Sequence, residues 1–112
     1  MTAAADYRAI EVATGKTHLR DLKLITAGDG LYIKEGTNAT MGVATLVAGS
    51  VVVSTTKVTA NSRIQITIQA LGTVTVPTVI GVTARTAGTS FTITSADVVD
   101  TSTVAWMIVE PA

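Results

Sequence analysis

The stretch from Thr83 to Ala112, TARTAGTSFTITSADVVDTSTVAWMIVEPA, decides the fold and contains the only Phe and the only Trp of the chain. Ser90 to Ser95 alternates, with Phe91 and Ile93 on one face and threonines on the other. Successive side chains of a strand point to opposite faces, so this pattern predicts a strand with one buried face. Val104 to Val109 is apolar on both faces, and we expect its second face to be covered by the same chain or by another copy.

The rest of the chain shows further short strands separated by turn signals. Arg63 to Gln69 alternates most clearly and places three isoleucines on one face, namely Ile64, Ile66 and Ile68. We expect this face to meet the face of Phe91 in the core. Additional strands are predicted at Val43 to Val47, Ser50 to Ser54 and Thr78 to Thr86, the last with a bulge at Gly81. Short strands at this spacing predict a sandwich or a barrel.

The composition favours an all-β protein that associates with other subunits. Hydrophobic residues make up 47% of the chain but aromatic residues only 4%, so Val, Ile, Leu and Ala supply the apolar mass. Val, Ile and the abundant Thr are branched at Cβ, which suits a pleated sheet. Charged residues are only 14%, against about 25% in a typical domain. We infer that much of the surface faces another subunit.

The same composition argues against several classes of partner. The formal net charge is zero, which gives no electrostatic case for nucleic acid or an anionic membrane. The chain has no apolar run of transmembrane length, and its first residues, MTAAADYR, lack the pattern of a secretion signal. Without cysteine, disulfides, thiol catalysis and Cys-based zinc sites are excluded.

The charges divide the chain into a polar N-terminal segment, residues 1–35, and a β-rich body, residues 36–112. Ten of the sixteen charged residues lie in the segment. Leu19 and Leu22 have the spacing of a helix, whereas Leu22 and Leu24 have that of a strand. We favour extended structure, because Ala27 to Gly30 is a turn signal, and we expect a short strand at Leu31 to Lys34.

No group of residues has the pattern of an active site. His18 is the only histidine and has Asp21 three residues away, but one imidazole and one carboxylate form neither a metal site nor a triad. Asp97 and Asp100 could act as an acid–base pair, but in a Ser- and Thr-rich connection we expect them to cap turns. Trp106 could stack on a sugar, but in an apolar strand it favours a core or interface role. We therefore expect no enzyme, cofactor or metal.

Four segments in order carry a resemblance to a known group of proteins. They are Met41 to Gly49, Thr59 to Ile64, Ala87 to Ile93 and Trp106 to Glu110. Together they resemble a β-domain that recurs in virion proteins of tailed bacteriophages, over about Asn38 to Ala112. The resemblance implies a non-enzymatic, antiparallel, jelly-roll-like β-sandwich that forms a homotrimer. The sequence departs from the family pattern between Gln69 and Thr78, where ALGTVTVPT stands in place of a Gly-richer loop.

The resemblance includes both capsid decoration (cement) proteins and the knobs of tail fibres and spikes. Only about thirty-five residues precede the body, which favours a decoration protein over a knob on a long shaft. The first expectation is therefore a protein made in the host cytoplasm that binds the major capsid protein and stabilises the surface of the head. The alternative is a tail-fibre or fibre-tip knob that contacts other tail proteins and a host surface receptor.

Two sets of residues are predicted to make the contacts. Attachment requires polar groups that pair with a partner, and Tyr and Arg are enriched among interface anchors. The candidates for the attachment contact in the N-terminal segment are Tyr7, Arg8, Arg20 and Lys23. The candidates for the core or the trimer interface are Phe91, Ile93, Val104, Trp106 and Ile108.

Overall fold

A computed structural model describes residues 15–76 and 79–112, and the chain divides into two units, Met1–Leu31 and Tyr32–Ala112. The described residues form strands and no helix, which confirms the all-β prediction. The strands are β1 (Met41–Thr45), β2 (Ser50–Ser54), β3 (Arg63–Ala70), β4 (Ile80–Thr86), β5 (Ser90–Ser95) and β6 (Thr103–Val109). Within the described ranges, nothing helical is long and apolar enough to cross a membrane.

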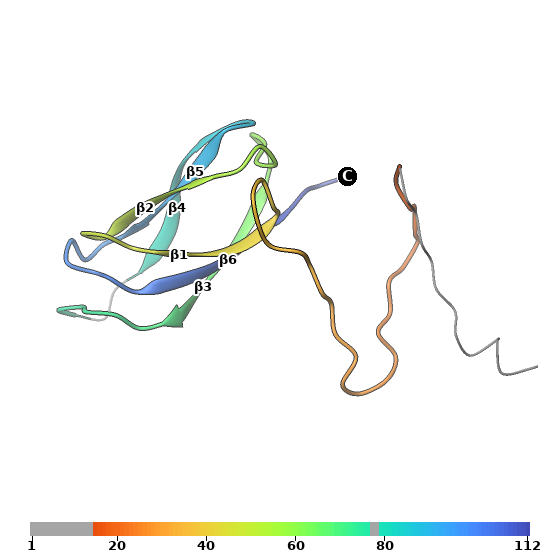
Figure 1. The fold of residues 1–112 in the computed structure, drawn as a ribbon, viewed down its shortest axis with the longest axis horizontal. Coiled ribbons are helices and arrows are strands. Elements are labelled where there is room, and N and C mark those ends of the chain that lie inside the picture. The colour runs from red at the N-terminus through yellow and green to blue at the C-terminus, as the bar shows by residue number, and fades with distance from the viewer. Residues whose placement is uncertain (1–14, 77–78) are drawn as a thin grey trace, which may run out of the picture. The chain divides into compact units, whose positions relative to one another are not determined.

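The strands form two antiparallel three-stranded sheets that pack as a sandwich (Figure 1). One sheet has the order β1-β6-β3 and the other the order β2-β5-β4. Each sheet is therefore built around one of the last two strands of the chain. With six strands in the described residues, the sandwich is smaller than the eight-stranded jelly roll.

The two central strands supply most of the core. On β6 the inward side chains Val104, Trp106 and Ile108 are buried, and on β5 Phe91 and Ile93 are fully buried. The Phe91 and Trp106 rings meet edge to face, with centroids 5.3 Å apart and an interplanar angle of 77°, a preferred geometry for an aromatic pair. All five core or interface candidates thus lie in the core of a single chain.

Gly42 makes room for the large indole on the neighbouring strand. It pairs with Trp106 across the β1–β6 ladder. A Cβ built on Gly42 would lie 2.7 Å from Cζ2 of the indole, closer than carbon atoms approach. Any larger residue at position 42 would therefore have to displace Trp106 or bend β1.

The isoleucine face of β3 is only partly in the core. Ile64 and Ile66 pack against the buried cluster, as predicted. The prediction for Ile68 is wrong, because its side chain is 39% exposed. The β3–β6 register shifts between Ile68 and Ala70, where the ladder ends, so this end of β3 leaves the sandwich. Ile68 instead lines an open hollow of about 350 Å³ together with Leu71 and Ile80.

Most strand positions and turns follow the sequence pattern. The bounds of β2 and β5 agree with the predicted ranges. Ala48 and Gly49 both have positive φ, 50° and 81°, as a tight type I′ turn requires, and this turn passes the chain from one sheet to the other. The β4 bulge lies between Val82 and Ala84 rather than at Gly81.

The N-terminal segment contains the predicted turn but not the predicted strand. The Asp29 N–H donates to the Thr26 carbonyl at 2.9 Å, and the Thr26 N–H donates to Asp29 Oδ2 at 3.0 Å. Leu31 to Lys34 is not a strand, because no described segment pairs with it. A short alternating run becomes a strand only where a neighbour accepts its hydrogen bonds.

Candidate functional site

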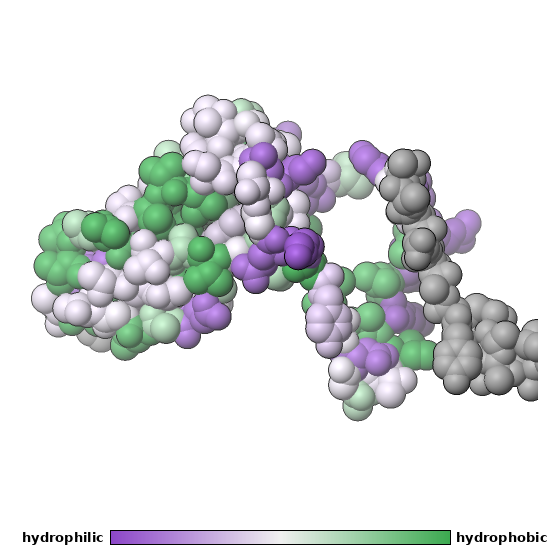
Figure 2. All heavy atoms as spheres, in the orientation of Figure 1, coloured by the Kyte–Doolittle hydropathy of each residue, from purple (hydrophilic) through white to green (hydrophobic). Residues whose placement is uncertain are grey.

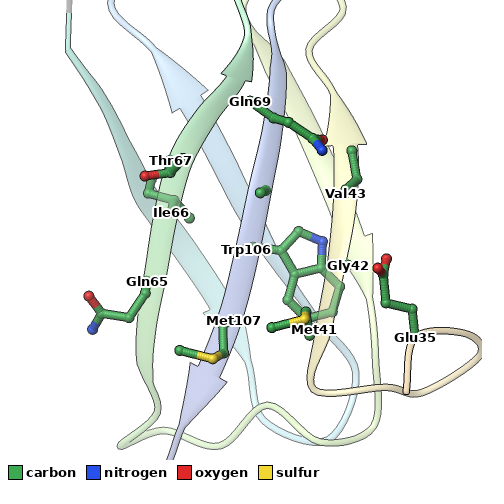
Figure 3. A pocket seen from close by; sticks show the side chains of 11 residues that line it. Glu35, Met41, Gly42, Val43, Gln65, Ile66, Thr67, Gln69, Trp106 and Met107 are labelled. Carbon is green, nitrogen blue, oxygen red and sulfur yellow. The ribbon is translucent and has the colours of Figure 1, made fainter. Parts of the chain in front are cut away.

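The outer face of the β1–β6–β3 sheet contains a hollow lined by side chains of all three strands. We call this surface the β6 face. Its hollow has a volume of about 410 Å³ (Figure 3). The side chains that define the β6 face come from all three strands and are Met41, Val43, Gln65, Thr67, Gln69, Ala105 and Met107. The ladder brings them together, since Met41 and Gln65 both pair with Met107, and Val43 and Thr67 both pair with Ala105.

The β6 face has an apolar floor and a polar margin. Met41, Val43, Ala105 and Met107 form the floor and carry no charge. The β3 side chains add amides and a hydroxyl, and Glu35 is the only ionisable residue that lines the hollow. Figure 3 shows this carboxylate beside β1, across the face from the glutamine of β3 at position 65.

This arrangement settles part of the expectation for Val104 to Val109. One face of β6 is buried by its own chain, as its alternating burial shows. The other face stays partly open, because Ala105 and Met107 are half-buried and Val109 is 47% exposed. The apolar residues on both faces of Val104 to Val109 therefore belong to a strand with one buried face and one face that is partly exposed to solvent.

The outer face of the opposite sheet has a different chemistry. Val52 is 61% exposed there and pairs with Thr92. Its neighbours are mostly hydroxyl side chains, and Thr83 Oγ1 lies 2.7 Å from Thr94 Oγ1 across the β4–β5 ladder. Hydroxyls hydrogen-bond water well, so this face is suited to solvent. Figure 2 shows hydrophobic residues in several patches over the visible side of the sandwich, separated by residues of intermediate hydropathy.

Asp97 and Asp100 cap turns, as predicted, and hold the connection before β6. Asp97 Oδ2 accepts hydrogen bonds from the Thr75 N–H at 2.6 Å and from Thr75 Oγ1 at 2.8 Å, and Asp97 Oδ1 accepts from the Val99 N–H at 3.0 Å. Asp100 Oδ1 accepts from the Ser102 N–H at 2.8 Å. Both carboxylates are occupied by structural hydrogen bonds to turns.

These hydrogen bonds make the stability of the sandwich depend on pH. The Val99 N–H, followed by the donors of Thr75, lowers the pKa of Asp97 below its ordinary 3.8, and Ser102 is the main cause that lowers the pKa of Asp100. A lowered folded-state pKa contributes stability that is present above the unfolded-state pKa and lost as pH falls through the folded-state value. We expect the urea midpoint to be constant above about pH 5 and to fall below about pH 4. Asp97→Asn should flatten this decrease, and an unchanged profile in Asp97→Asn would contradict the assignment.

A second polar network closes the end of β6 and was not predicted from the sequence. The Glu110 carboxylate accepts hydrogen bonds from Thr59 Oγ1 at 2.7 Å and from Ser62 Oγ. Arg85 Nη1 donates to the Ser62 carbonyl at 2.6 Å. The hydroxyls of Ser62 and then Thr59 lower the pKa of Glu110. Ser62 and Glu110 are 48 positions apart, so no local pattern could indicate their contact.

The structure does not bring the attachment candidates into one site. Tyr7 and Arg8 lie outside the described residues, and Arg20, Lys23 and His18 are exposed. The exposure of the apolar residues in the same N-terminal segment was not predicted. Five of these side chains are 52–84% exposed, namely Leu19, Leu22, Leu24, Ile25 and Leu31. Over residues 15–76 and 79–112, no three acidic or histidine side chains are grouped as a metal site requires.

A comparison with protein families gives a match over the sandwich. The model of the family described as K1 capsule-specific polysaccharide lyase, C-terminal domain, matches residues 38–109. The matched range contains all six strands of the sandwich and covers more than half of the chain. No curated protein matches the chain. The chain therefore belongs to the family of the K1 capsule-specific polysaccharide lyase C-terminal domain.

Proposed function

We propose that this chain is a non-enzymatic structural domain of a bacteriophage tail spike or tail fibre. The observation that carries the proposal is the family match, which spans the complete sandwich from residue 38 to residue 109. The family is that of a C-terminal domain associated with phage tail spikes. The match supports a virion protein in general terms and favours the tail alternative over capsid decoration, which it does not support.

The roles of three carboxylates of the sandwich support a structural function. Asp97 and Asp100 hold turns, and Glu110 fastens the loop before β3 to the end of β6. Each is engaged by donors of its own chain, and each has a lowered pKa. A general acid needs the opposite, a pKa raised towards the working pH.

The partners that we propose are further copies of the chain and other tail proteins. Three copies is the number that the resemblance implies. The N-terminal segment would make the contact with other tail proteins, because it combines most of the charge with exposed leucines. Apolar anchors surrounded by polar groups are typical of such contacts. Contact with a host receptor stays a prediction.

Immunogold electron microscopy of intact virions tests the proposed location. An antibody raised against the sandwich, residues 38–112, should place gold particles at the tail. Antibody absorbed beforehand with the purified protein is the control for specific labelling. Gold distributed over the head would contradict the proposal and favour the decoration role.

A further inference from the structure

We propose that the β6 face is a docking surface for a second copy of this chain, with Glu35 of one copy placed against Arg63 of the next. This inference deepens the proposed association of copies by naming its surface, but it does not rest on the tail location, because its observations come from the β6 face alone. It names the surface through which copies associate and the pair of charges that sets their orientation.

The first observation is that the β6 face has the composition of an interface centre. Its floor of Met41, Val43, Ala105 and Met107 is apolar, and methionine is enriched at interfaces. Val43 is 47% exposed in the middle of β1, where water covers it in the single chain. The floor carries no charge, so no charged group there would lose its hydration when the face is covered.

The second observation concerns the two margins of the β6 face, which carry opposite charges. Glu35 lies beside β1 at one margin (Figure 3). Arg63 is the first residue of β3 at the other margin, and it alternates in phase with Gln65, which lines the hollow. The Arg63 guanidinium donates from Nη1 to the Asn61 carbonyl and also acts electrostatically on the Glu110 carboxylate of its own chain. Its remaining N–H groups can serve a further acceptor.

Opposite charges at opposite margins fit a second copy. If copies are arranged around an axis parallel to the strands, the β1 margin of one copy meets the β3 margin of the next. Glu35 then faces Arg63, while the uncharged floors meet each other. Such pairing fixes orientation more than it adds affinity, and it can close into a ring. A strongly charged partner would find no complementary charge on the floor.

The two sheets provide a matched pair of variants for the test. Val43 on β1 and Val52 on β2 are both exposed valines in five-residue strands at a sheet edge, but only Val43 belongs to the β6 face. The full chain, Val43→Glu and Val52→Glu are compared by sedimentation equilibrium. Val43→Glu should raise the concentration at half-association at least about tenfold, whereas Val52→Glu should change it less than about twofold. Circular dichroism melts confirm that both variants are folded.

The charge pair has its own test, which depends on contact between copies. Glu35→Arg and Arg63→Glu should each weaken association, because like charges then meet. An equimolar mixture of the two variants should associate more tightly than either alone. If Arg63→Glu fails to fold, Arg63→Gln replaces it for the single-variant comparison.

Three results would overturn the proposal. The first is a wild-type chain that stays monomeric up to a concentration of about 100 μM. The second is an equal effect of Val43→Glu and Val52→Glu on the concentration at half-association. The third is a mixture of Glu35→Arg and Arg63→Glu that associates no more tightly than either variant alone. A monomeric wild type would leave the tail location untouched, because the labelling experiment decides that question independently.

Discussion

Replacing Phe91 with alanine is expected to lower the free energy of unfolding by about 3–5 kcal/mol. Phe91 lies on β5 and is fully buried, and its ring meets the Trp106 indole edge to face. The substitution removes the apolar area of the ring and the aromatic contact, and it leaves a cavity between the two sheets. Phe91 is the largest fully buried side chain among the described residues, so its removal leaves a cavity that the neighbouring side chains fill only in part.

Urea unfolding of Phe91→Ala, monitored by circular dichroism, measures this loss. Val52→Ala is the control, because Val52 is 61% exposed on the outer face, and surface substitutions usually change stability by less than about 0.5 kcal/mol. Phe91→Leu should lie between the two, since it keeps part of the buried area. Equal midpoints for Phe91→Ala and the wild type would show that the two sheets do not pack around this ring.

Removing residues 1–29 is expected to leave a folded sandwich that is no longer incorporated into virions. The six strands, both polar networks and the matched family range all lie beyond residue 29. The deletion takes away the attachment candidates Arg20 and Lys23 together with four exposed apolar side chains, from Leu19 to Ile25. Copies held together would present several such segments at once, so their loss should reduce incorporation at least about a hundredfold.

Complementation of a phage that lacks the gene, followed by immunoblotting of purified virions, measures incorporation. Circular dichroism of the truncated protein shows whether the sandwich is folded. A double substitution, Arg20→Ala with Lys23→Ala, separates the contribution of charge from that of the apolar residues. Normal incorporation of the folded truncated protein would place the attachment surface in the sandwich and leave the N-terminal segment with a structural role.

The parts of the fold that could be predicted depend on neighbouring residues. The bounds of β5 followed from the alternation of Ser90 to Ser95, and those of β2 agree with the short strand predicted at Ser50 to Ser54. Asp97 was assigned to a turn because it lies in a Ser- and Thr-rich connection, and its bond to the Val99 N–H spans only two residues. Interactions of this range are contained in the local sequence and need no knowledge of the sheet.

The parts that could not be predicted depend on residues far apart in the chain. The exposure of Ile68 follows from a register shift against β6, and the failure of Leu31 to Lys34 to form a strand follows from the lack of a described neighbour. Of the β6 face, only the apolar second side of Val104 to Val109 was predicted. The contributions of β1 and β3 became visible only when the register placed Met41 beside Met107.

The strand order has a consequence for how the protein is made. β1 and β3 pair with β6, and β2 and β4 pair with β5. The four strands that the ribosome produces first therefore obtain their hydrogen-bonded neighbours from the two that it produces last. A nascent chain that ends at Thr86 contains β1 to β4 but none of these strand pairs. Its apolar segments are therefore exposed and can be bound by chaperones or cleaved by proteases. The sandwich can form only after translation has passed Val109, so a folded domain reports that the message was read through to this point.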